Sequence, residues 1–171
     1  MRAPRLVRSF FARYQEKSPP LNSVLEGIGA CIAILVVGVI THFSGHTFII
    51  ASFGASCVLL FSFPDSPIAQ PVNVIGGHLL TTAIGLLTFA FLPAEWWSVS
   101  IAIGASVTMM AVFRLTHPPA GGNPLALLAA GEFGLDYLVM PILAGSVIIV
   151  VIAAVYNKAT QVMLHKVKPE E

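Results

Sequence analysis

Charged residues are scarce in this sequence. Only 10% of its 171 residues are Asp, Glu, Lys or Arg, whereas 56% are hydrophobic. Soluble domains usually carry about a quarter charged residues. The basic residues gather near the two ends, and Arg114 is the only lysine or arginine between Lys17 and Lys158. This composition excludes an ordinary soluble domain and predicts an integral membrane protein.

Cysteine and the common ligand-binding motifs are also missing or rare. Cys31 and Cys57 lie inside apolar runs without a second Cys or a His at metal-ligand spacing, which excludes a disulfide framework and a zinc site. The sequence has neither a glycine-rich phosphate loop nor a basic stripe suited to nucleic acid. We therefore expect no metal, no cofactor and no nucleic-acid partner.

The two ends of the chain differ from its middle. Residues 1–21 alternate basic with aromatic or aliphatic side chains, which predicts a short interfacial helix on an anionic leaflet, or else a disordered tail. The start of the chain lacks the apolar core and cleavage site of a removable signal peptide, so a prokaryotic inner membrane is the simplest location. Residues 159–171 are predicted to form a cytoplasmic tail.

Between these ends, residues 22–158 form a single predicted transmembrane domain. Apolar stretches near 22–42, 72–92, 98–113 and 135–156 are predicted spans of a hydrocarbon core about 30 Å thick. Together they indicate an all-α membrane protein with four transmembrane helices.

Two further stretches break the helical pattern. Residues 116–124 contain three prolines and two glycines, which cannot continue a membrane helix. Irregular backbone at membrane depth is tolerated only where protein or a wet cavity surrounds it. Residues 46–63 allow two interpretations: one continuous span, or a segment that enters extended, turns at Gly54 and leaves as a half-helix.

An internal repeat favours the second interpretation. A shift of about 67 residues sets 53–58 on 120–125, so that repeat 1 covers about 22–92 and repeat 2 about 97–157. Each repeat then holds a span, a broken half-helix and a second span.

The predicted fold therefore has four transmembrane helices plus two re-entrant half-helix segments, arranged as two parallel repeats of the same orientation. This even number of crossings leaves both basic ends on one side, which the positive-inside tendency makes cytoplasmic. Asp65, Glu132 and Asp136 are then expected on the outer side.

The two broken segments supply the candidate binding site. Helix N-termini carry unpaired amides and about half a positive charge, and glycine lets a ligand approach those amides. A protonatable histidine and an arginine would complete an electropositive pocket for a small anion. The candidate substrate-binding residues are Gly54, Ala55, Ser56, His78, Arg114, His117, Pro118, Pro119, Gly121, Gly122 and Asn123.

Three motifs also give the chain a family resemblance. The sequences His117-Pro118-Pro119, Phe53-Gly54-Ala55-Ser56 and Asn73-Val74-Ile75-Gly76-Gly77-His78 occur in the order found in the HPP family of integral membrane proteins. The resemblance runs from about Glu26 to Asn157. It implies a four-span protein that transports nitrite, whereas the residues themselves indicate only a small anion.

Other interpretations of these residues remain open. His78 can serve as a core histidine bonded to a carbonyl, and Arg114 can pair with Glu132 or Asp136 or extend to the interface. The protein can be a non-transporting membrane partner or a channel for a neutral solute. A dyad of Ser56 with His78 or His117 lacks an evident third orienting group, so we do not expect an enzyme. We do expect a homo-oligomer in the lipid bilayer, because four helices scarcely enclose a pathway.

Overall fold

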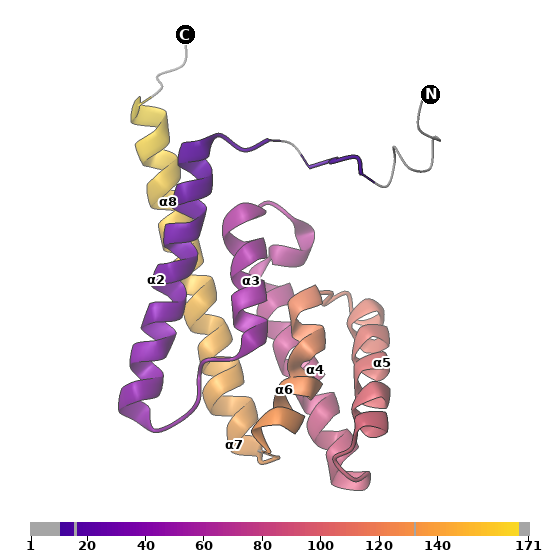
Figure 1. The fold of residues 1–171 in the computed structure, drawn as a ribbon. Coiled ribbons are helices and arrows are strands. Elements are labelled where there is room, and N and C mark those ends of the chain that lie inside the picture. Colours follow the sequence, from indigo (N-terminus) through magenta and orange to yellow (C-terminus); the bar gives the residue numbers. More distant parts are fainter. Residues whose placement is uncertain (1–10, 16, 132, 168–171) are drawn as a thin grey trace, which may run out of the picture.

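The computed structural model describes residues 11–15, 17–131 and 133–167. This part of the chain forms an all-helical bundle (Figure 1). Its elements are α2 (Pro20–Ser44), α3 (Ala51–Ser62), η1 (Pro67–Ala69), α4 (Pro71–Phe91), α5 (Trp96–Val112), η2 (Pro118–Gly122), α6 (Asn123–Ala130), α7 (Leu135–Tyr137), η3 (Leu138–Ala144) and α8 (Gly145–Val167).

Three helical stretches are long and apolar enough to cross a membrane. They are Pro20–Ser44, Pro71–Phe91 and Leu135–His165, and α3 and α5 are shorter apolar helices. The described part of the predicted interfacial helix, residues 11–15 and 17–19, is not helical. Residues 1–10 of that prediction lie outside the described residues.

Local sequence explains where several helices begin and end. Prolines stand in the first turn of α2, α4, η2 and α6, where the missing N–H has no helical partner to lose. Gly45 ends α2 with φ 74° and Gly131 ends α6 with φ 65°, a left-handed conformation that glycine adopts at little cost. Pro141 lies within the π-helical segment η3, where it interrupts the regular α-helical bonding.

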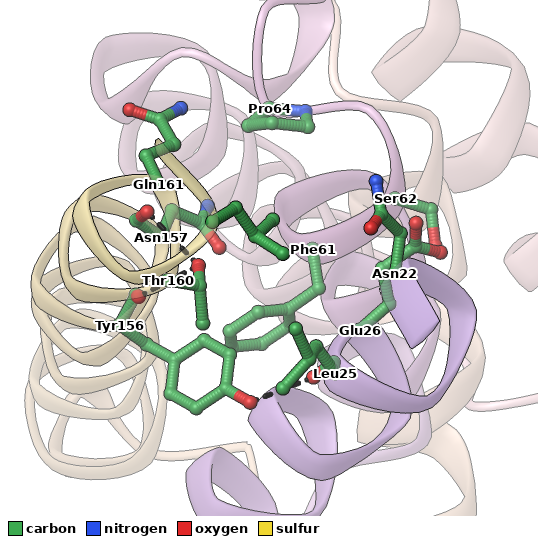
Figure 2. Close-up of a pocket in the computed structure, with 11 residues that line it drawn as sticks. Asn22, Leu25, Glu26, Phe61, Ser62, Pro64, Tyr156, Asn157, Thr160 and Gln161 are labelled. Atoms are coloured by element: carbon green, nitrogen blue, oxygen red, sulfur yellow. Dashed lines mark hydrogen bonds between the residues drawn. The ribbon is translucent and has the colours of Figure 1, made fainter. Parts of the chain in front are cut away.

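Residues 46–50 and the helix α3 that follows them run along α2 in the opposite direction. The Phe48 N–H donates to Thr41 Oγ1 near the end of α2, at 2.9 Å, whereas Phe61 near the end of α3 packs against Gly29 in the first third of α2. Figure 2 shows Phe61 beside Leu25 of α2 and Tyr156 of α8. This segment therefore returns to the end of the bundle at which α2 begins and α8 ends, which we name the terminal end.

The second broken segment runs the other way. Asn73, in the first turn of α4, donates to the Thr116 carbonyl at 3.1 Å, so the end of α5 lies beside the start of α4. Further along α4, Gly77 packs against Ala120 and Gly85 packs against Leu127. η2 and α6 therefore run parallel to α4, away from the terminal end.

The final helix returns to the terminal end. Gly145 of α8 packs against Phe53, and Asn157 donates to the Leu60 carbonyl at 2.8 Å, so α8 is parallel to α3. Successive passes thus alternate in direction from α2 to α8 (Figure 1).

This arrangement corrects the predicted topology. Neither broken segment returns to the end of the bundle from which it starts. The structure therefore does not show the two predicted re-entrant segments. Residues 46–50 and the 12 residues of α3 together reach at most about 35 Å, since extended residues add about 3.3 Å and helical residues 1.5 Å each. The sequence interpretation placed the turn at Gly54, which lies inside α3.

The two halves also have opposite orientations, so the predicted parallel arrangement is wrong. The 67-residue shift nevertheless matches element boundaries: Ala51 at the start of α3 falls on Pro118 at the start of η2, and Pro71 falls on Leu138. Because each half contains three passes, the second half begins where the first ended and is inverted.

The charges follow the corrected arrangement. Asp65 lies in the turn between α3 and η1 at the terminal end, whereas Asp136 lies beside Gly45 at the opposite end. The predicted common location of these two residues is therefore wrong. Glu132 lies outside the described residues.

Candidate functional site

Polar side chains gather at the point where the two broken segments pass each other. α3 contacts η2 and α6 there, and both η2 and α6 also contact α4. The cluster consists of six side chains with 0% exposure: Ser56, His78, Thr81, Thr82, His117 and Asn123. Ionisable side chains so deep in an apolar bundle are costly, and they usually mark a functional site.

Ser56 lies at the centre of this cluster. Its Oγ is 2.9 Å from Nε2 of His78 and 2.8 Å from Nε2 of His117. The same hydroxyl is 2.9 Å from the carbonyl oxygen of Ser52, one turn earlier in α3. Three helical elements far apart in the sequence are therefore joined through one side-chain oxygen.

The backbone positions His117 for this contact. His117 has extended φ and ψ of −137° and 98°, as expected for a residue that precedes proline. Its Nδ1 donates to the Ile68 carbonyl of η1 at 2.8 Å. An added Cβ at Gly77 would come within 2.9 Å of the His117 Cβ, so a glycine at this point of α4 permits the close approach.

Asn123 closes the other side of the cluster. Its Nδ2 lies 2.9 Å from Thr82 Oγ1, 3.1 Å from the His78 carbonyl and 3.1 Å from His78 Nδ1. As the first residue of α6, Asn123 is fixed in place by that helix. The amide therefore holds the His78 ring in one orientation.

A buried aromatic side chain borders the cluster. The Phe53 ring meets the His78 ring edge to face, with centroids 5.0 Å apart, and the two histidine rings are 5.2 Å apart. Phe53 has 0% exposure. The polar groups are thus enclosed by an apolar wall that excludes water from this side.

Ser52 adds an unusual polar group to the first turn of α3. Its Oγ is buried and has no hydrogen-bond partner, and the whole residue is only 8% exposed. The first amides of a helix likewise have no intrahelical partner. Since Ser52 and Ser56 are four residues apart, they lie on the same face of α3. A buried hydroxyl without a partner calls for an explanation, and a bound polar ligand is one.

The structure brings together only some of the predicted site residues. Ser56, His78, His117 and Asn123 converge, whereas Gly54 and Ala55 are exposed on α3. Counted from the N-cap residue Ile50, the amides of Gly54 and Ala55 lie beyond the first four N–H groups of α3, which have no partner four residues back within the helix. Those amides cannot form the predicted anion site.

The remaining predicted residues surround the cluster without entering its hydrogen bonds. Pro118 is exposed and Pro119, Gly121 and Gly122 are partly exposed in η2. Arg114 is exposed after α5, with a left-handed φ of 58°. It lies toward the terminal end beside Asn73, far from Asp136, so the predicted ion pair between Arg114 and Asp136 is wrong.

Sequence reasoning missed Thr81 and Thr82 of the cluster, and also Ser52 and the Ile68 carbonyl beside it. Ser52 precedes Ser56 by four residues, and Thr82 follows His78 by four, so helical periodicity on the polar residues could have found both. The Ile68 carbonyl carries no side-chain signal in the sequence. Among the described residues, no three His, Cys, Asp or Glu side chains are grouped so that they could hold a metal ion.

Comparisons with known proteins agree with this architecture at the level of family. The chain is 28% identical over 173 residues to a transmembrane protein of Dictyostelium discoideum, covering 88% of this chain and 55% of that protein. A second transmembrane protein of the same organism is 31% identical over 159 residues, covering 84% and 55%. The chain therefore spans about half the length of these relatives.

No solved structure matches the chain. The transmembrane region of the HPP family, in contrast, matches residues 15–164, which contain every described helix except the last residues of α8. The chain belongs to the HPP family of transmembrane proteins.

Proposed function

We propose that this protein is a membrane transporter for a small inorganic anion, with nitrite as the first substrate to test. The observation that carries the proposal is the cluster of six polar side chains with 0% exposure in the apolar bundle. The resemblance to characterised HPP proteins suggests nitrite. The Dictyostelium relatives are described only as transmembrane proteins.

The arrangement around the cluster suits transport. Secondary transporters commonly bind substrate near the membrane centre, between inverted repeats and beside broken helices. Here α3 and α6 are the broken helices, and they pass each other beside Ser56 and Asn123. The unpartnered Ser52 hydroxyl and the amides of the first two residues of α3, before the bonded Phe53 N–H, offer hydrogen-bond donors to an anion.

An acyl-transfer enzyme is the alternative that the Ser56 contacts favour. A serine hydroxyl beside an imidazole, which a third group orients, is the arrangement of a serine nucleophile, and the Ile68 carbonyl occupies the orienting position at His117 Nδ1. Ser56 and both histidines have 0% exposure, so an acyl substrate, like a transported anion, reaches them only when the bundle opens. Covalent labelling of Ser56 by a fluorophosphonate would favour the enzyme.

The proposed membrane topology has six passes, with both ends in the cytoplasm. Arg13, Lys17 and Lys158 lie near the terminal end. Arg114, which follows α5, also lies toward that end. The positive-inside tendency makes this end cytoplasmic. A homo-oligomer in a prokaryotic inner membrane remains part of the proposal. Crosslinking of the protein in native membranes tests the oligomer.

Cysteine labelling tests the topology. In a protein whose Cys31 and Cys57 are replaced by serine, Asp65→Cys should react with an impermeant reagent from the cytoplasmic side, and Asp136→Cys from the opposite side. Two re-entrant segments would instead place both residues on the outer side. Labelling of both from one side would therefore exclude six passes.

Uptake by proteoliposomes tests the transport itself. Wild-type protein should accumulate nitrite above the level of protein-free vesicles. Ser52→Ala should raise the half-saturating nitrite concentration about tenfold, because a hydrogen bond to a charged group contributes about 1.5–3 kcal/mol. Ser100→Ala is the matched control, since Ser100 is exposed on α5 and bonds only the carbonyl of Trp96. Uptake no faster than in empty vesicles would reject nitrite transport, and a panel of small anions and neutral solutes extends the test.

A further inference from the structure

The Ser56 hydroxyl has more hydrogen-bond partners than one fixed protonation state of its neighbours can use. The Ser52 carbonyl, 2.9 Å away, can only accept. His78 Nε2 and His117 Nε2 lie at 2.9 and 2.8 Å. A serine hydroxyl has one hydrogen to donate and two lone pairs that accept. If all three contacts are hydrogen bonds, Ser56 donates to Ser52 and accepts from both imidazoles.

The neighbours of the two rings determine which nitrogens carry hydrogen. His117 Nδ1 must donate, because the Ile68 carbonyl at 2.8 Å only accepts. Both hydrogens of Asn123 Nδ2 are donated to Thr82 Oγ1 and the His78 carbonyl, so His78 Nδ1 donates to Asn123 Oδ1, 3.3 Å away. The Nε2 atoms of a neutral His78 and a neutral His117 therefore both face the Ser56 hydroxyl with a lone pair.

A proton on one ring removes this competition for the Ser56 hydrogen. With both rings neutral, Ser56 donates to only one Nε2, and the other ring nitrogen has no hydrogen bond. In a His117 imidazolium, Nε2–H donates to Ser56 Oγ and Ser56 donates to His78 Nε2, so every ring nitrogen is bonded. His117 is the better place for the proton, because its Nδ1 lies 2.8 Å from a carbonyl oxygen, whereas His78 Nδ1 lies 3.3 Å from its acceptor.

Among the residues that the structure describes, no acidic side chain faces His117 to balance such a charge. From α3, the titratable neighbour is the Cys57 thiol; from α4, it is His78. The described parts of η1, η2, α5, α6 and η3 contribute no carboxylate to the cluster. Asp65 is exposed in the turn before η1, Glu95 precedes α5 at the far end, and Asp136 lies in α7, also at the far end. An isolated imidazolium in the bundle centre would be costly.

We propose that His117 takes up a proton together with the transported anion, so that the protein is a proton–anion symporter; this inference rests on the proposed anion transport. An anion held near the start of α3 supplies the negative charge that the imidazolium needs. The proton binds at His117 Nε2, and the Ser56 hydroxyl turns to donate to His78 Nε2. On release the N–H bond breaks, the hydroxyl turns back, and one proton and one monovalent anion leave as a neutral pair.

Proteoliposomes with separately imposed gradients test the coupling. Nitrite uptake is measured at alkaline pH, where nitrous acid is scarce, and protein-free vesicles give its background. Potassium and valinomycin clamp the membrane potential. A pH gradient of one unit, acid outside, should drive about tenfold accumulation at equal potential, since one unit corresponds to about 1.4 kcal/mol. A membrane potential at equal pH should drive no accumulation.

Variants locate the proton. His117→Gln keeps a side-chain amide at this position but cannot hold a charge, so any nitrite uptake that it retains should follow the potential and ignore the pH gradient. Ser56→Ala keeps both rings but removes the bridging oxygen, and it should lower accumulation driven by the pH gradient. Tyr156→Phe is the control, because it removes a partly buried bond to the Leu25 carbonyl at the terminal end and should leave coupling unchanged.

The wild-type measurement decides the proposal even if the variants fail to fold. Uptake that follows the potential and not the pH gradient would overturn the symport while leaving anion transport intact. A His117→Gln protein that still accumulates nitrite tenfold with the pH gradient would overturn the role of His117. Absence of uptake under every gradient would reject nitrite transport and, with it, its coupling to a proton.

Discussion

The core has two halves, each built from residues of both repeats, that share a scaffold but not its chemistry. The 67-residue shift sets His78 of α4 on Gly145 of α8, and Thr82 on Ile149. It also sets Ile50, before α3, on His117, before η2. The polar half of the core, with His78, Thr82 and His117, thus corresponds to an apolar half with a glycine and two buried aliphatic residues.

This difference shows where rearrangement is possible. On the apolar side Ile149 has 0% exposure, Ile50 has 5% exposure, and Gly145 packs against Phe53, so the side chains are held by close packing alone. On the polar side the groups are held by hydrogen bonds whose donors and acceptors change when one proton is added. A single polar half also limits the cost of burying polar groups in an apolar bundle.

The largest effect is expected from a side chain at the centre of the apolar half. An added Cβ at Gly145 would approach the Phe53 Cζ to 2.9 Å, and Phe53 cannot withdraw, because it also packs on His78. Gly145→Val should therefore destabilise the protein by about 3 kcal/mol, at the upper end for overpacking. Thermal unfolding in detergent measures the loss.

A matched glycine substitution controls for helix propensity. Gly27 of α2 has no atom within 4 Å of an added Cβ, so Gly27→Ala should keep or slightly raise stability. Adding Phe53→Leu to Gly145→Val should recover part of the loss. Equal unfolding temperatures for Gly145→Val and the wild type would show that the apolar half is not closely packed.

The next effect concerns the amide at the centre of the polar half. Asn123→Ala removes the donor shared by Thr82 and His78 and leaves buried polar groups without partners. The expected loss is about 1–3 kcal/mol in the free energy of unfolding. An unchanged unfolding transition would mean that water replaces the amide and that the cluster is not dry.

A pair of corresponding substitutions compares the halves directly. Thr82→Val removes the acceptor of the 2.9 Å bond from Asn123 Nδ2 while keeping the shape of the side chain, and we expect a loss of about 1 kcal/mol or more. Ile149→Val removes one methylene and should lose about 0.5–1.5 kcal/mol.

Transport separates these two substitutions more clearly than stability does. Thr82→Val should slow nitrite uptake because the orientation of Asn123, and through it of His78, changes. Ile149→Val should leave uptake unchanged. Similar uptake by both variants would contradict a functional difference between the halves.

The sequence allowed some of this site to be predicted. The polar residues among apolar runs identified Ser56, His78, His117 and Asn123, because buried polar groups are rare enough to stand out. The repeat was visible because both broken segments contain small residues and turn formers. Family membership was predicted from three motifs and is confirmed by the match over residues 15–164.

The direction of the broken segments could not be predicted. Whether residues 46–50 turn back or continue depends on long-range contacts such as that of Phe48 with Thr41, which leave no local pattern. The bond from His117 to the Ile68 carbonyl could not be predicted either. Every residue has a carbonyl, so the sequence does not mark which one accepts this bond. The sequence therefore indicated the membership of the cluster better than its geometry.

The smallest effect is expected at Gly54, which the sequence placed at the centre of the anion site. Gly54 lies in the second turn of α3, is exposed, and has no atom within 4 Å of an added Cβ. Its amide lies within the helical bonding of α3, so a ligand cannot use it. Gly54→Ala should therefore leave nitrite uptake unchanged and change stability by at most about 1 kcal/mol, in the favourable direction, through helix propensity. Loss of uptake without a change in unfolding temperature would return Gly54 to the transport pathway, whereas loss of crosslinked oligomer would place this face of α3 between subunits.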